Sequence, residues 1–201
     1  MNKTFKNKFK LIQRITVIHT LTLLAVIALL LAFGGSTFSE LLRYQRESIL
    51  EGQLWRVLTA PLVHLNWPHT IMNTTGLIII WGLFGPTLTN RAWVIITLVC
   101  TLCISSALLL FNPDIRWYVG LSGLLHSYFA AGAIAERHIA QRTSIVMLIL
   151  ITSKLIWEQL LGPLPGSAET GGGKVIVEAH MYGAISGLIF GWFLTRKKLG
   201  K

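Results

Sequence analysis

Six long runs of apolar residues, separated by short breaks, dominate the pattern along the chain. They cover residues 15–33, 68–88, 92–111, 118–135, 143–161 and 175–195, and the breaks carry Gly, Pro, Asn or charged residues. A helix needs about 20 mostly apolar residues to cross the hydrocarbon core of a bilayer. The pattern therefore predicts an all-α polytopic membrane protein, a bundle of six transmembrane helices.

The same pattern divides the chain into one membrane domain with two short basic tails. We expect a tail at residues 1–14, a six-span domain at 15–195 and a tail at 196–201. The longest connection, residues 34–67, mixes apolar and charged residues, which predicts an amphipathic outer loop at the membrane surface. The first apolar run is longer than the roughly 7–15 residues of a secretory signal, so we expect it to be kept as a span.

Composition and charge agree with a membrane protein and predict its orientation. Only 13% of the residues are charged, about half the share of a soluble domain. Twelve of the 18 Lys and Arg residues lie in the two tails and in the second-to-third and fourth-to-fifth connections. Because cytoplasmic loops carry an excess of positive charge, we expect both termini in the cytoplasm. A net charge of +10 divided among short loops does not form the basic face that a nucleic-acid partner needs.

Polar side chains interrupt three of the apolar runs at a similar depth. His69 and Asn73 lie in the second run, Ser122 and His126 in the fourth, and His180 in the sixth. Polar groups inside a span are energetically expensive, so they mark candidate functional sites. The expected boundaries place His69, Asn73, Ser122 and His180 within about 8 Å of the outer ends of their helices, which predicts one polar pocket near the outer surface.

A serine beside a histidine can act as a nucleophile with its base. The imidazole takes the hydroxyl proton during attack, and N–H groups from His69, Asn73 and the Ser122 backbone can stabilise the oxyanion. His180 is one candidate for the base. His126, one turn after Ser122 on the same helix, is a second candidate that the pattern leaves open.

The sequence shows no acidic residue in an obvious position to orient His180. Glu178 lies two residues before it and so points elsewhere on the helix. Lys154 and Glu158 are four residues apart near the outer end of the fifth run, where we expect an ion pair that extends outward to water. The pattern therefore favours a Ser/His dyad. It also predicts no metal site, since no carboxylate is expected at the depth of the histidines.

Glycines predict which helices touch. Gly183, Gly187 and Gly191 recur every four residues after His180, and such a stripe lets a neighbouring backbone approach closely. Gly120 and Gly123 flank the serine and leave room for a substrate main chain. If the fourth and sixth helices pack along these faces, the serine and the histidine face each other.

Four motifs resemble those of the rhomboid family of intramembrane serine proteases, and they occur in that family's order. They are Trp55-Arg56, the HxxxxHxxxN spacing of His64, His69 and Asn73, the GxSG string Gly120-Leu121-Ser122-Gly123, and an AHxxGxxxG pattern that begins at Ala179 and includes His180, Gly183 and Gly187. The resemblance implies a six-transmembrane-helix rhomboid-like bundle without a cofactor. It implies Ser122 as the nucleophile, His180 as the base, and His69, Asn73 and the Ser122 N–H as the oxyanion hole. Trp55 and Arg56 would be structural parts of the outer loop.

His126 stands where many rhomboids carry a tyrosine that packs on the catalytic imidazole. The resemblance implies that it supports His180 by packing or by a hydrogen bond, with a direct proton role left open. The compact length and the string Gly-Leu-Ser-Gly-Leu-Leu-His resemble the rhombosortases, a bacterial subgroup. That resemblance implies an inner-membrane enzyme whose site opens to the periplasmic side. Its substrate would be a single-span membrane-anchored protein, cut at the C-terminal Gly-Gly-type sorting anchor of secreted proteins.

Two other functions fit part of the pattern. A non-catalytic rhomboid-like protein would bind and sort membrane clients, but loss of the serine or the histidine would mark it, and both are present. A small transporter would need a polar track through the inner half of the bundle, where the second, fourth and sixth runs are nearly all apolar. We therefore expect an intramembrane serine endopeptidase.

Overall fold

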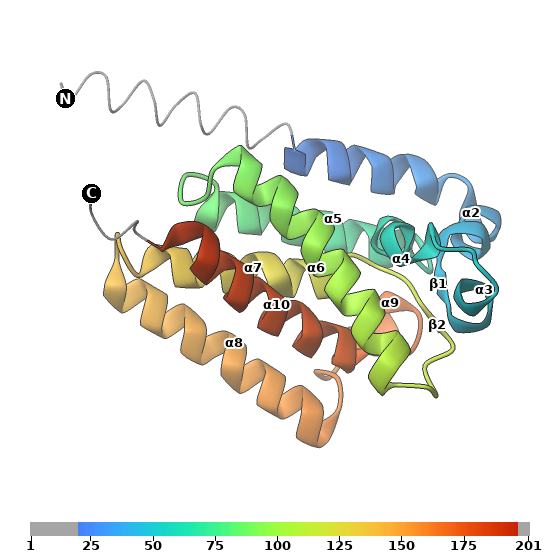
Figure 1. Ribbon diagram of the computed structural model, residues 1–201. Coiled ribbons are helices and arrows are strands. Elements are labelled where there is room, and N and C mark those ends of the chain that lie inside the picture. Colours follow the sequence, from blue (N-terminus) through green and yellow to red (C-terminus); the bar gives the residue numbers. More distant parts are fainter. Residues whose placement is uncertain (1–19, 197–201) are drawn as a thin grey trace.

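The computed structural model describes residues 20–196, which form a helical bundle with one short β-ladder (Figure 1). The long helices are Thr20–Ala32, α5 (Trp67–Phe84), α6 (Asn90–Phe111), α7 (Ser122–Glu136), α8 (Gln141–Leu161) and α10 (Val177–Thr195). Each of the six apolar runs overlaps one of these helices, so the predicted helical class is confirmed. The tail expected at 1–14, the start of the first run and residues 197–201 lie outside the described residues.

Two of the helices in the described part of the chain, α6 and α8, are long and apolar enough to cross a membrane by length and composition. The helix Thr20–Ala32 is apolar but shorter. The predicted count of six spans therefore stays a prediction.

The boundary expected for the fourth span is wrong. The apolar run begins near residue 118, but α7 begins at Ser122. Tyr118 belongs instead to β2 (Trp117–Tyr118), which pairs antiparallel with β1 (Tyr44–Gln45) and places Tyr44 opposite Tyr118. The run therefore begins in a β-strand and not in the helix. As a result, Ser122 is the first residue of its helix rather than lying one turn inside it.

The connection expected at 34–67 is folded. It contains α2 (Gly35–Leu42), β1, α3 (Arg46–Leu50), α4 (Arg56–Thr59) and the 3-10 helix η1 (Ala60–Leu62). The buried Arg56 guanidinium donates from Nη1 to the carbonyl oxygens of Glu40 at 2.7 Å and Arg43 at 3.0 Å. Hydrogen bonds from a charged donor to buried carbonyls are strong, so Arg56 holds the segment together from inside.

Helix α7 lies in the middle of the bundle and contacts α5, α6, α8 and α10 (Figure 1). Small residues allow this, since Ala130, Ala131 and Ala133 on α7 are all buried. The closest approach is to α10, where a Cβ placed on Gly183 would lie 2.1 Å from the Gly123 carbonyl oxygen. One placed on Gly187 would lie 2.1 Å from the Ser127 carbonyl oxygen. The glycine stripe therefore packs α10 directly on the backbone of α7, as the sequence predicted.

Three side-chain hydrogen bonds join the helices at one end of the bundle. Thr20 donates to Asn90, Thr87 donates to Glu136, and Arg137 Nη1 donates to Thr195 Oγ1. The described chain begins and ends at this end (Figure 1). The opposite end carries β1, β2 and α9 (Ser167–Gly171), and Ser122 begins α7 there.

Candidate active site

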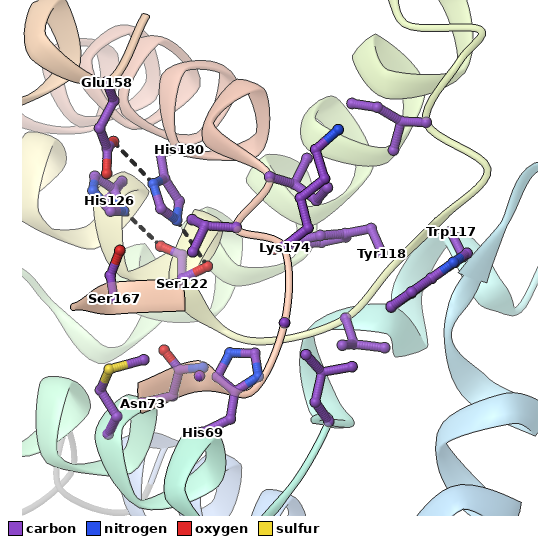
Figure 2. A pocket seen from close by; sticks show the side chains of 18 of the residues that line it. His69, Asn73, Trp117, Tyr118, Ser122, His126, Glu158, Ser167, Lys174 and His180 are labelled. Atoms are coloured by element: carbon purple, nitrogen blue, oxygen red, sulfur yellow. Dashed lines mark hydrogen bonds and ion pairs between the residues drawn. The ribbon is translucent and has the colours of Figure 1, made fainter. Parts of the chain in front are cut away.

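Ser122 and His180 meet across the contact between α7 and α10. Ser122 is the first residue of α7, and His180 lies in the first turn of α10. The close packing of the two helices brings Ser122 Oγ to 3.0 Å from His180 Nε2 (Figure 2). This is hydrogen-bond distance between a hydroxyl donor and an imidazole acceptor. The two side chains that the sequence placed in one pocket are therefore in contact.

Glycine at position 120 makes the approach to the serine possible. Its φ of +106° is a conformation that other residues rarely adopt. A Cβ there would also lie 2.8 Å from His69 Nε2 and 3.3 Å from Asn73 Nδ2. Tyr118 secures this turn by donating from its hydroxyl to the Gly120 carbonyl oxygen at 2.7 Å. The turn thus leaves the space between Ser122 and α5 free of side-chain atoms from residue 120.

An acidic residue contacts His180, although the sequence showed none in an obvious position to do so. Glu158 on α8 places its Oε2 at 2.9 Å from His180 Nδ1 (Figure 2). Its other oxygen, Oε1, accepts from Lys154 Nζ at 2.6 Å. The expected i, i+4 ion pair therefore exists, but the Glu158 side chain is only 3% exposed and points into the site. The expectation of an outward-facing pair was wrong.

His126 stacks flat on the His180 ring. The ring centroids lie 4.2 Å apart with an interplanar angle of 13°. His126 Nδ1 lies 2.7 Å from the Ser122 carbonyl oxygen, and its Nε2 lies 2.9 Å from Lys154 Nζ. Both ring nitrogens thus face groups other than the Ser122 hydroxyl, so the geometry favours His180 as the proton acceptor.

His69 and Asn73 lie on α5 and face the same cavity as Ser122 (Figure 2). Asn73 is almost fully buried, and among the described residues its Nδ2 has no hydrogen-bond partner. A buried donor without an acceptor costs folding free energy unless a ligand or a water molecule accepts its hydrogen bond. Asn66 holds this end of α5 in place, because its Oδ1 accepts from the His69 backbone N–H at 2.8 Å. The amide of Asn73 is therefore a free donor aimed into the site.

His64 supports His69 from outside the cavity. The two rings meet edge to face with centroids 5.0 Å apart. Burial, together with the neighbouring His69, lowers the pKa of His64 to about 3. His64 is therefore neutral at physiological pH, and it serves as a packing partner for His69.

The cavity has a volume of about 450 Å³ and is lined by both polar and apolar residues. Ser122, His180, His69 and Asn73 lie together on its wall with His126, Lys154 and Glu158, and Asp114, Arg116 and Lys174 add further charges. The apolar lining includes Met72, Ile115, Val119, Leu164, Val175 and Ile176. The segment from α8 to α10 covers one side and contributes Ser167 and Gly171 of α9. The Asn66 amide donates to the Gly171 carbonyl oxygen at 3.2 Å and so ties this cover to α5. The cavity therefore presents both apolar and charged side chains beside Ser122 and His180.

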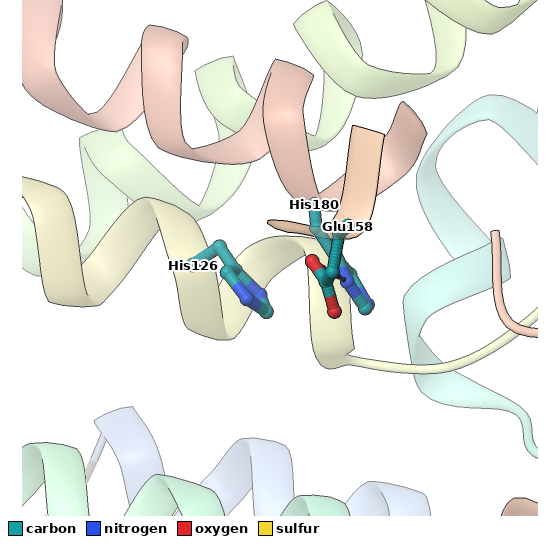
Figure 3. A group of neighbouring side chains, drawn as sticks. All are labelled: His126, Glu158 and His180. Atoms are coloured by element: carbon teal, nitrogen blue, oxygen red, sulfur yellow. Dashed lines mark hydrogen bonds and ion pairs between the residues drawn. The ribbon is translucent and has the colours of Figure 1, made fainter. Parts of the chain in front are cut away.

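His126, Glu158 and His180 offer possible metal-ligand atoms within 4.8 Å of one another (Figure 3). The expectation that no carboxylate lies at the depth of the histidines was therefore wrong. However, the Lys154 ammonium contacts both His126 Nε2 and Glu158 Oε1. The positively charged Lys154 side chain thus already pairs with two of the three residues that a metal ion would need as ligands.

Comparison with known proteins gives one family and several relatives. The model of the rhomboid domain matches residues 51–197. The uncharacterized protein ML1171 of Mycobacterium leprae is 25% identical over 146 residues, which cover 71% of this chain and 57% of that protein. The uncharacterized proteins Mb1372 of Mycobacterium bovis and Rv1337 of Mycobacterium tuberculosis are also 25% identical over 146 residues, covering 71% of this chain and 60% of each. The chain thus spans less than two thirds of the length of the curated relatives it matches.

Proposed function

Because this chain belongs to the rhomboid family, whose members are integral membrane proteins and generally serine proteases, we propose that it is an intramembrane serine endopeptidase. Ser122 is the nucleophile and His180 the base. The observation that carries this proposal is the 3.0 Å contact between Ser122 Oγ and His180 Nε2 at the wall of a cavity. The nucleophile and its base come from different helices, so the contact depends on the tertiary packing.

The chemistry follows from the positions of these atoms. His180 Nε2 takes the hydroxyl proton as Ser122 Oγ attacks the scissile carbonyl, and it then gives the proton to the leaving amine. Water next attacks the acyl-enzyme in the same way, with His180 again as the base. His126 holds the His180 ring by stacking, which takes the packing role expected from the sequence.

The oxyanion hole is formed by Asn73, His69 and the backbone N–H of Ser122. The Ser122 N–H has no intrahelical partner, because the first N–H groups of a helix lack an acceptor. Asn73 Nδ2 supplies a second donor that is unpaired among the described residues. Preorganised donors of this kind stabilise the charge that develops on the carbonyl oxygen.

Replacing Asn73 with alanine should lower kcat by about 10²- to 10³-fold and change KM little, because the lost hydrogen bond acts on the oxyanion. Initial rates of peptide cleavage measure this effect. Thr74→Val is the matched control, since the Thr74 hydroxyl bonds only to backbone carbonyls of its own helix. Equal losses in the two variants would assign the effect to packing of α5 and contradict the oxyanion role.

The proposal includes a six-span bundle at residues 15–195 with both termini in the cytoplasm. Two observations support this orientation. The described chain begins and ends at one end of the bundle (Figure 1), and Arg137 lies there too. The site lies toward the opposite end, where Ser122 begins α7. In a bacterial inner membrane this end faces the periplasm.

The proposed substrate is a single-span protein that is cut near the outer face of the membrane. A peptide bond must leave its helix before it can be attacked, so small or helix-breaking residues near the cut site are expected. The rhombosortase-like string around Ser122 supports a C-terminal anchor with a Gly-Gly motif, a hydrophobic span and a basic tail. Residue 120 leaves space beside the serine for a substrate main chain.

A reporter tests this function. The purified protein in liposomes is mixed with a reporter that ends in Gly-Gly, a hydrophobic span and a basic cluster, and the product mass is measured. We expect one cut near the Gly-Gly motif and no cut when that motif is replaced by Leu-Leu. A protein that binds the reporter without cutting it, and that does not react with a fluorophosphonate probe, would instead be a client-binding member of the family.

A further inference from the structure

Five residues around the site form a closed circuit of contacts, which passes through the side chain and the backbone carbonyl of Ser122. Ser122 Oγ contacts His180 Nε2, His180 Nδ1 contacts Glu158 Oε2, and Glu158 Oε1 contacts Lys154 Nζ. The same Lys154 Nζ contacts His126 Nε2, and His126 Nδ1 contacts the carbonyl oxygen of Ser122. Three helices, α7, α8 and α10, contribute to this circuit.

Donor and acceptor roles around the circuit are mutually consistent. The Lys154 ammonium can only donate, so His126 Nε2 accepts and His126 Nδ1–H donates to the Ser122 carbonyl oxygen. The Glu158 carboxylate can only accept, so His180 Nδ1–H donates to it. This leaves the lone pair of His180 Nε2 directed at the Ser122 hydroxyl. The network therefore assigns the tautomer of His180 that a general base requires.

We propose that Glu158 is a positioning residue that completes a Ser122–His180–Glu158 triad, with Lys154, itself in contact with His126, holding the carboxylate in place. This inference rests on the proposed protease function and adds to it a third member, carried by α8. Glu158 keeps the His180 ring in the productive tautomer and orientation, and it stabilises the imidazolium that forms during attack.

The burial of the pair supports this role over that of a surface salt bridge. The Glu158 side chain is 3% exposed, whereas that of Lys154 is 31% exposed. A buried carboxylate is costly unless it is paired and hydrogen-bonded. Here each carboxylate oxygen accepts a hydrogen bond from its own donor. These two bonds fix the rotamer of Glu158 and stabilise its negative charge. Lys154 stays partly exposed while its Nζ contacts Glu158 Oε1 and His126 Nε2.

Glu158→Gln is the main test. The amide can present its NH₂ group to His180 Nδ1, which favours the tautomer that carries the proton on Nε2 and cannot accept from Ser122. We expect kcat to fall about 10²- to 10⁴-fold, with KM changed less than about twofold. The rate of fluorophosphonate labelling of Ser122 should fall in parallel, since it requires the same base but no peptide substrate. Glu158→Asp should recover part of both rates.

Glu178→Gln is the matched control, because it removes a carboxylate two residues before His180 on the same helix. It should keep the wild-type rates. Wild-type labelling and cleavage in Glu158→Gln would overturn the inference and leave the protease proposal intact. Equal losses in Glu158→Gln and Glu158→Asp together with a lowered Tm would also overturn it, because they would show a role in folding alone. A wild-type protein that neither labels nor cleaves would remove the protease function itself and the triad with it.

Discussion

Replacing Ser122 with alanine is expected to lower the rate of reporter cleavage by about 10⁴- to 10⁶-fold, leaving only the residual rate that substrate binding and the oxyanion hole support. The substitution removes the one oxygen that lies 3.0 Å from His180 Nε2. It leaves the Cβ and the helix start in place, and alanine is well accommodated in a helix. Without that oxygen no acyl-enzyme can form, so any remaining hydrolysis proceeds by direct and much slower attack of water on the peptide carbonyl.

The measurement is the initial rate of product formation by mass, together with fluorophosphonate labelling. The variant should keep the wild-type Tm, because only one side-chain oxygen is lost. His180→Ala should give a similar loss of rate, whereas His126→Ala should retain measurable cleavage, since His126 acts by stacking on the base. Cleavage that survives in Ser122→Ala would refute the serine mechanism. Cleavage that survives in His180→Ala and disappears in His126→Ala would reverse the assignment of the base.

Much of the fold, and the meeting of Ser122 with His180, could be predicted because local signals determine them. The apolar runs located the long helices, and the four-residue spacing of Gly183 and Gly187 predicted a close helix contact. The partner of that contact is the backbone of α7. Since Ser122 and His180 lie at matching heights on the two helices, the prediction that they face each other followed. Helix faces and heights can be derived from periodicity, which explains this success.

The contact of Glu158 with His180 was missed because it depends on the rotation of one helix relative to others. The i, i+4 spacing to Lys154 predicts an ion pair on any helix, and at a helix end the usual position of such a pair is outward. In the structure α8 turns this face toward α7 and α10, so the carboxylate reaches His180 and the ammonium reaches His126. No local pattern along α8 fixes that rotation. The one available signal was an acidic residue within an otherwise apolar run.

The start of α7 was missed for a related reason. Tyr118 is aromatic and begins an apolar run, so hydropathy assigns it to a span, with Trp117 just before it. Their backbone instead pairs with Tyr44 and Gln45, which lie more than 70 residues earlier. A strand partner so far away in the sequence does not change the periodicity of apolar residues in the run, so hydropathy cannot reveal it. The pairing matters for the site, because it ends just before the Gly120 turn that exposes Ser122.

The Gly183→Ala substitution is expected to separate the reacting pair as well as the helices. Its Cβ would lie 2.1 Å from the carbonyl oxygen of Gly123, and real contacts of this kind are essentially never under 3.0 Å. The atoms it meets are backbone, so α7 and α10 must move apart by about 1 Å. Overpacking of this kind costs about 1–3 kcal/mol of unfolding free energy. A displacement of about 1 Å between Ser122 and His180 should further reduce the rate about 10²-fold or more.

Gly82→Ala supplies the control, because Gly82 also lies in a long helix, α5, and a Cβ there meets no atom within 4 Å. Alanine is better than glycine in a helix by about 1 kcal/mol, so this variant should be as stable as the wild type or more stable, with an unchanged cleavage rate. Thermal unfolding in detergent and reporter cleavage together measure both effects. If Gly183→Ala keeps the wild-type Tm and rate, the α7–α10 contact does not set the distance between nucleophile and base. If it lowers Tm but keeps the rate, the serine and the histidine are held together by the contacts of Glu158 and His126 with His180 and not by the glycine stripe.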